Sequence, residues 1–215
     1  MFMKKLTGTA FLITFLIFLL IIGVSLIFEN GRTEEIRKSF AETDVLWNDA
    51  RFFSEYAANA SAGECGGMME ENRKLGDRIY SEGLKIEKYE GANKLTDAIL
   101  TEKKRYALLD LQFWKNSIEI RKKCGSEFST VIYFYSQYNS TADQKLMDRI
   151  LFDFKQRCGP ATVYITLPVD MDLSSINLIK GLYNITQIPS VLINEETTVN
   201  GAVSLDELNR HAECW

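Results

Sequence analysis

The sequence has little of the residues that most often carry enzyme chemistry. Among its 215 residues there is a single histidine, His211, and four cysteines, none of which form a Cys-x-x-Cys pair. A zinc site or a Cys–His nucleophile pair normally needs several such residues at close spacing. We therefore predict no metal site, no cofactor and no catalytic residue.

Prolines, internal repeats and basic patches are also scarce or missing. The chain has 3 Pro, so no proline-rich linker separates its parts, and its net charge is -4. A nucleic-acid-binding surface is usually marked by clustered Lys and Arg, so we predict no nucleic-acid partner. A chain of this length forms one large domain or two small ones.

One long segment lacks charge altogether. Residues 6–28, LTGTAFLITFLIFLLIIGVSLIF, follow Lys4 and Lys5 directly. Because about 20 apolar residues in a helix span a bilayer, we predict a transmembrane signal anchor here, with the lipid bilayer as its partner. The positive-inside rule then predicts that residues 1–5 form a cytoplasmic tail and that the rest is extracytoplasmic. The alternative is a cleavable signal peptide, but its apolar core is typically ~7–15 residues long and ends at a small-residue site.

The pattern from residue 32 to residue 124 is helical. The segment SAGECGG (61–67) is expected to end a first helix, and a second is expected over 68–89. After Gly91, Ile99, Tyr106, Phe113 and Ile120 repeat every seven residues in a third helix, as in a coiled coil. These helices form either a short antiparallel bundle or a dimerisation stalk, so a homo-oligomer is one possible assembly.

After Cys124-Gly125 the spacing of the apolar residues changes from a purely helical pattern to alternating strand and helix patterns. TVIYFYS (130–136) and ATVYITLP (161–168) are typical of strands, and amphipathic helices are expected over 141–158 and 172–183. IPSVLIN (188–194) and TTVNG (197–201) then predict a hairpin, followed by a last helix from Ser204. This order predicts an α/β domain with a parallel strand pair, a right-handed crossover and an antiparallel edge.

Several of these segments resemble the thioredoxin family. YFYSQYNSTADQ is similar to the family's strand and active-site loop, and YNITQIPSVLIN is similar to the segment around its cis-proline, whereas the family's usual first strand is not evident. The resemblance covers 129–215 and implies a mixed sheet of about four strands. We therefore expect an α/β thioredoxin-like domain over 129–215, preceded by a helical bundle over 32–124 and one transmembrane helix.

The resemblance also shows where the chain departs from the family. Tyr138 falls where the family has tryptophan, and Asn139 and Ala142 fall where it has its two cysteines. Dithiol exchange needs an activated thiolate and a resolving thiol, which these two residues do not provide. Thr141 and Gln144 instead predict a capping box at the helix start. The resemblance implies that Pro189 is the cis-proline and that Ile188 offers free backbone groups to an extended peptide.

The four cysteines of an exported chain suggest disulfides. In the thioredoxin-like arrangement the helix that ends at Cys158 and the last helix share one face of the sheet, which brings Cys158 near Cys214. Cys65 and Cys124 both lie in turns at helix ends and form the other pair. We predict the disulfides Cys65–Cys124 and Cys158–Cys214.

These observations predict an outward-facing, membrane-anchored protein whose thioredoxin-like domain binds a protein or peptide, in a chaperone-like or assembly role. The candidate peptide-binding residues are Tyr138, Asn139, Ile188 and Pro189. One alternative is a thiol–disulfide oxidoreductase that uses non-standard cysteines. Another is a structural envelope component that oligomerises through its helical region.

Overall fold

The structure is a computed structural model, and it describes residues 2–91, 97–125, 128–159 and 162–212. The chain divides into two compact units, residues 1–42 and 43–215. Helix α1 (Phe2–Asn59) begins in the first unit and ends in the second. Each unit is considered by itself below.

The first unit is the N-terminal part of α1. Its described side chains between Phe11 and Ile27 are mostly exposed, and the exposed fractions of these two end residues are 75% and 73%. Within the part of the chain that the structure describes, no helix has a stretch long and apolar enough to cross a membrane.

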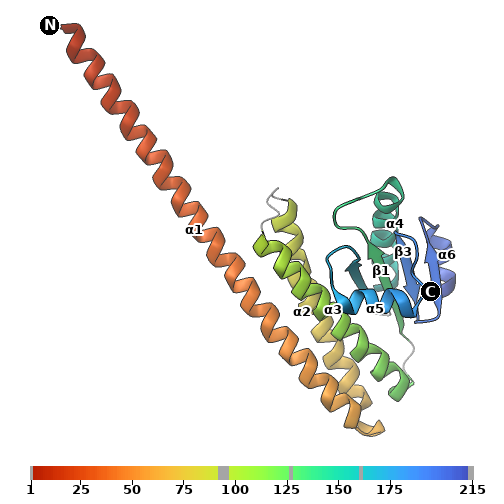
Figure 1. Cartoon of the computed structure of the whole chain (residues 1–215). Helices are drawn as coiled ribbons and strands as arrows, with labels where there is room; N and C mark the ends of the chain where they lie inside the picture. Colours follow the sequence, from red (N-terminus) through yellow and green to blue (C-terminus); the bar gives the residue numbers. More distant parts are fainter. Residues whose placement is uncertain (1, 92–96, 126–127, 160–161, 213–215) are drawn as a thin grey trace. The chain divides into compact units, whose positions relative to one another are not determined.

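The second unit opens with a helical region. Residues 43–59 of α1 lead through a short 3₁₀ turn (Ala62–Glu64) into α2 (Cys65–Gly91), and α3 (Asp97–Cys124) packs along α2 (Figure 1). The glycine pair Gly66-Gly67 lies inside α2, so the predicted break over 61–67 is wrong in its second half. The chain leaves the first helix at Ala60, before these glycines, and Cys65 already belongs to the next helix.

The heptad residues of α3 face inward as expected. The side chains of Ile99, Phe113 and Ile120 are buried, and Tyr106 is half-buried. Asn116, a polar residue of α3, is also buried, and its Nδ2 donates to the carbonyl of Ala50 on α1 at 2.9 Å. This seam thus packs within the chain, as a bundle does.

The C-terminal half contains a mixed four-stranded sheet with the order β2-β1-β3-β4. Its strands are β1 (Ser129–Tyr135), β2 (Thr162–Pro168), β3 (Ser190–Ile193) and β4 (Thr197–Asn200). β1 pairs with β2 in parallel and with β3 antiparallel, and β3 and β4 form the predicted hairpin. The helices of this half are α4 (Ala142–Cys158), α5 (Ser174–Leu182) and α6 (Leu205–Ala212).

Strand alternation divides the core into two layers, because successive side chains point to opposite faces of a sheet. Ile132 and Phe134 of β1 pack with α3 and α5 on one face. Val131 and Tyr133 pack with α4 and α6 on the other. α4 and α6 therefore share a face, as the resemblance implied.

A polar cluster joins α3 to the sheet. Arg121 of α3 forms an ion pair with Glu195 in the β3–β4 turn, and Trp114 Nε1 donates to the same carboxylate at 2.8 Å. Arg121 Nη1 also donates to Asn194 Oδ1 at 2.9 Å. Asn194 and Glu195 have φ values of 52° and 59°, which suits a type I′ hairpin turn. The turn thus aims both side chains back at α3.

Candidate functional site

The candidate site lies at one end of the sheet, where three connections meet. The register pairs Tyr135 with Pro168 and Phe134 with Ser190. The segment 136–141 after β1, the segment after β2, and Ile188-Pro189 before β3 therefore leave the sheet at the same end. The sequence-predicted residues Tyr138, Asn139, Ile188 and Pro189 all belong to these segments.

Asp170 holds the loop after β1 in place. Its carboxylate accepts from the Ser136 hydroxyl at 2.6 Å, from the Gln137 N–H at 2.8 Å and from the Tyr138 N–H at 3.2 Å. Burial alone raises the pKa of this carboxyl, but the three hydrogen bonds outweigh it, so the pKa of Asp170 lies below its usual range. Asp170 is thus ionised at neutral pH and orders the loop.

The start of α4 is capped by side chains rather than open for a thiolate. Thr141 is the N-cap, and its Oγ1 accepts from the Gln144 N–H at 3.1 Å. The predicted capping box is only half correct, since the Gln144 side chain reaches back to Ser136 instead of Thr141. Gln144 Oε1 accepts from the Ser136 N–H at 2.9 Å, and its Nε2 donates to the Ser136 carbonyl at 3.0 Å. Ser136 is therefore fixed from both sides.

The outer part of the loop is exposed to solvent. Tyr138 has 55% of its surface exposed, and Asn139 and Thr141 are exposed as well. Asn139 N–H donates to Ser136 Oγ at 2.8 Å, which leaves its side-chain amide at the surface. The loop offers an aromatic ring and an amide on a rigid base.

The Ile188-Pro189 peptide bond is cis, and Pro189 is buried while Ile188 is half-buried. The Pro189 carbonyl accepts from the Gly201 N–H at 2.8 Å. Among the described residues, the backbone N–H and C=O of Ile188 have no hydrogen-bond partner. They remain available to a ligand chain.

A cleft adjoins the loop on the β2 side of the sheet, and sequence reasoning missed it. It has a volume of about 1,320 Å³ and runs between α2, α4 and the edge of β2. Five tyrosines line it: Tyr80, Tyr106, Tyr133, Tyr135 and Tyr164. They come from four different elements, so no local sequence pattern brings them together.

The surroundings of two carboxyl groups in this cleft raise their pKa values. Asp110 of α3 is buried, and desolvation raises its pKa well above the usual value although it accepts a hydrogen bond from the Thr166 backbone. Desolvation also raises the pKa of Asp148, whose carboxylate accepts from the Tyr133 hydroxyl at 2.8 Å. In the described part of the chain, no group of three or more His, Cys, Asp or Glu residues is arranged to hold a metal ion.

The cysteines lie away from the loop. The predicted disulfide Cys65–Cys124 is present and joins the start of α2 to the end of α3 across a Cα–Cα distance of 5.6 Å. Cys158 is buried at the end of α4, and its Sγ lies 3.9 Å from Asn209 Oδ1 on α6. Cys214 lies outside the described residues, so the Cys158–Cys214 pairing stays a prediction.

No protein-family model matches this sequence, and no curated protein matches it either. Solved structures do resemble the fold. Chloroplastic thioredoxin z aligns at a TM-score of 0.35 and 12% identity, over 45% of this chain and 85% of that chain. Thioredoxin O2 from Arabidopsis thaliana in its oxidised state aligns at a TM-score of 0.33 and 18% identity, over 48% of this chain and 86% of that chain. A protein described as malarial aligns at a TM-score of 0.32 and 11% identity, over 40% of this chain and 94% of that chain. About half of the chain is thus similar in structure to thioredoxin-fold proteins.

Proposed function

We propose that the chain is a membrane-anchored, outward-facing module that binds a protein or peptide at the loop end of its sheet, without dithiol exchange. The uncharged run of residues 6–28 supports the anchoring part of this proposal. The binding part is supported by the geometry around Ile188.

The unpaired backbone of Ile188 is the observation that carries the proposal. An N–H and a C=O that are held in place and have no partner can pair with an extended peptide, as an open strand edge does. The exposed ring of Tyr138 and the amide of Asn139 offer side-chain contacts at the same end of the sheet. Asp170 and Gln144 fix the loop in advance, which lowers the entropy lost on binding.

Photo-crosslinking in cells of the native host tests this proposal. A photoreactive phenylalanine analogue at position 138 is expected to capture a partner protein, whereas the same analogue at the exposed Arg157, near the other end of α4, is not. The second position is the matched control, because it lies on the same domain and is also exposed.

An Ile188→Pro variant removes the backbone N–H and also replaces a half-buried side chain that packs against the core. Loss of one hydrogen bond costs about 0.5–1.5 kcal/mol, so capture at position 138 should fall roughly two- to tenfold. Thermal melting of the variant checks that the domain is folded. A folded Ile188→Pro protein with undiminished capture, combined with undiminished capture from position 139 in a Tyr138→Ala background, would refute the site.

A further inference from the structure

The cleft between α2, α4 and β2 runs along most of the length of α2. Its wall on α2 reaches from Gly66 to Glu90. At 1.5 Å per residue this stretch of helix is about 36 Å long. An extended chain of about ten residues has the same length, at 3.3 Å per residue. The cleft therefore matches a peptide strand better than a compact small molecule.

The floor of the cleft is an unpaired sheet edge. β2 is the first strand in the order β2-β1-β3-β4, and most of its residues line the cleft. Val169 N–H donates to the Tyr135 carbonyl of β1, whereas the Thr166 backbone bonds to Asp110 on the other side. Because the backbone N–H and C=O groups of successive residues point to opposite sides of a strand, those of Thr162, Tyr164 and Thr166 point away from β1.

Part of this edge is still open. Asp110 engages the Thr166 backbone, but among the described residues Tyr164 has no backbone partner beyond the sheet. Two further wall residues contain unpaired buried acceptors, Asn72 Oδ1 and Gln137 Oε1. Ser117 Oγ donates to the Phe113 carbonyl and accepts from Asn72 Nδ2, which fixes the orientation of that amide. The wall of the cleft thus contains two buried hydrogen-bond acceptors that a donor on a ligand could satisfy.

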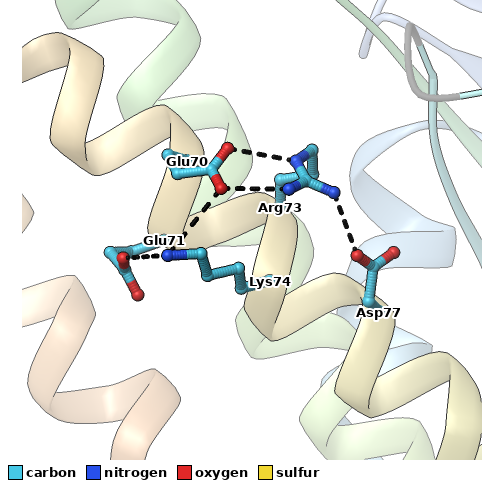
Figure 2. A network of polar contacts seen from close by, with 5 residues as sticks. All are labelled: Glu70, Glu71, Arg73, Lys74 and Asp77. Atoms are coloured by element: carbon cyan, nitrogen blue, oxygen red, sulfur yellow. Dashed lines mark hydrogen bonds and ion pairs between the residues drawn. The ribbon is translucent and has the colours of Figure 1, made fainter.

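The charge of the cleft is acidic. Its carboxylates are Glu70, Asp77, Glu87, Glu90, Asp110 and Asp148, and its basic side chains are Arg73, Lys103 and Lys155. Arg73 already bridges Glu70 and Asp77 on the rim, at 3.0 and 3.1 Å (Figure 2). Lys103 pairs with Glu90 at 2.7 Å. Among the described residues, neither Glu87 nor Asp148 forms a close ion pair, although Lys155 attracts Glu87 from within the cleft.

The aromatic wall already holds one ammonium group. Lys155 Nζ lies 3.1 Å from the ring centre of Tyr80 and 5.7 Å from that of Tyr164. An ammonium over a tyrosine face is stabilised by the ring quadrupole. The contact shows that this wall accepts the side chain of a lysine.

We propose that this cleft binds a basic peptide segment in extended conformation, which pairs with the outer edge of β2 and places its lysine or arginine side chains near Glu87 and Asp148. This site is distinct from the one at Ile188, which does not line the cleft. The acidic balance, the open edge and the length of the cleft all favour the same occupant.

A direct binding measurement with the full chain tests this proposal. The probe is a dye-labelled peptide of about ten residues that alternates lysine and threonine, and its control alternates glutamate and threonine. Fluorescence anisotropy should show binding of the lysine peptide that is at least about tenfold tighter than that of the glutamate peptide, and that weakens as salt is raised. A lysine peptide N-methylated at alternate residues cannot form the strand pairing and should bind several-fold more weakly.

Two charge reversals locate the site. Glu87→Lys, in the cleft, should raise the Kd of the lysine peptide roughly three- to tenfold. Asp153→Lys, exposed on α4 and outside the cleft, should leave it unchanged. Equal effects of the two variants, equal binding of the lysine and glutamate peptides, or no binding of the lysine peptide at millimolar concentration would each overturn the proposal. Ile188→Pro should not affect this Kd, which separates failure here from failure of the proposed function.

Discussion

At the residue scale, Asp170 explains how a loop without thiols keeps a defined shape. Its carboxylate bonds to one hydroxyl and two backbone N–H groups of the segment 136–138. Hydrogen bonds to a charged acceptor are stronger than those between neutral groups. The loop geometry therefore depends on an ionised side chain from the neighbouring connection.

In an Asp170→Asn variant, the free energy of unfolding should fall less steeply with decreasing pH in the acid range. Because the folded pKa of Asp170 is lowered, its contribution is complete above the unfolded value of about 3.9 and is lost as the pH falls through the folded pKa. Urea unfolding at a series of pH values between about 2 and about 7 measures this loss of stability. Asp172→Asn, two residues further and exposed, is the control. A parallel loss of stability in Asp170→Asn and the wild type below about pH 4 would show that the Asp170 carboxylate does not stabilise the loop.

At the scale of elements, α2 and α3 approach each other closely at two glycines. A Cβ at Gly76 would lie 2.7 Å from Phe113 Cζ, and one at Gly83 would lie 2.8 Å from Tyr106 Cζ. These glycines therefore make room for two rings of the heptad seam. Both glycines lie inside the helix predicted over 68–89, and the close approach of the two rings explains why a residue without a Cβ stands at each position.

The Cys65–Cys124 disulfide should stabilise this hairpin. It closes a loop with a sequence separation of 59, and such a loop stabilises the fold by about 2–4 kcal/mol, mainly by restricting the unfolded chain. Differential scanning calorimetry of a Cys65→Ser/Cys124→Ser protein should show a lower Tm, and each single variant should lose about as much. Ser81→Ala, exposed on α2, serves as the control. An unchanged Tm in the double variant would contradict the structural role of this bond.

The Arg121–Glu195 pair should contribute more than a surface ion pair. Its side chains are 19% and 13% exposed, so removing one partner leaves a largely buried charge. We expect Arg121→Ala to lower the free energy of unfolding by about 2–4 kcal/mol. A double-mutant cycle with Glu195→Gln should give a coupling energy above about 1 kcal/mol.

The exposed pair Arg78–Asp49, at 3.0 Å and about half-exposed on both sides, is the matched control. A double-mutant cycle on this pair should give a coupling energy of less than about 1 kcal/mol. Equal coupling energies in the two cycles would show that Arg121–Glu195 does not fasten α3 to the sheet.

At the scale of the whole molecule, the local patterns predicted the C-terminal domain well. The order of strands and helices, the β3–β4 hairpin and the Thr141 cap follow from contacts between near neighbours in sequence, which composition and period reveal. Glu195 was missed because its partners Arg121 and Trp114 are 74 and 81 residues away. The tyrosine-lined cleft was missed for the same reason, since its walls are formed by separate elements.

The central claim is that the loop end of the sheet binds a partner without exchanging thiols. The most direct measurement is capture by the photoreactive group at position 138 in the full chain, before and after alkylation of all free thiols, with products separated with and without reductant. If the loop end binds without thiol exchange, capture is equal under both conditions and no partner is attached through a bond that reductant cleaves. Capture that is lost on alkylation, or a partner held through a mixed disulfide with Cys65, Cys124, Cys158 or Cys214, would contradict this claim and favour an oxidoreductase.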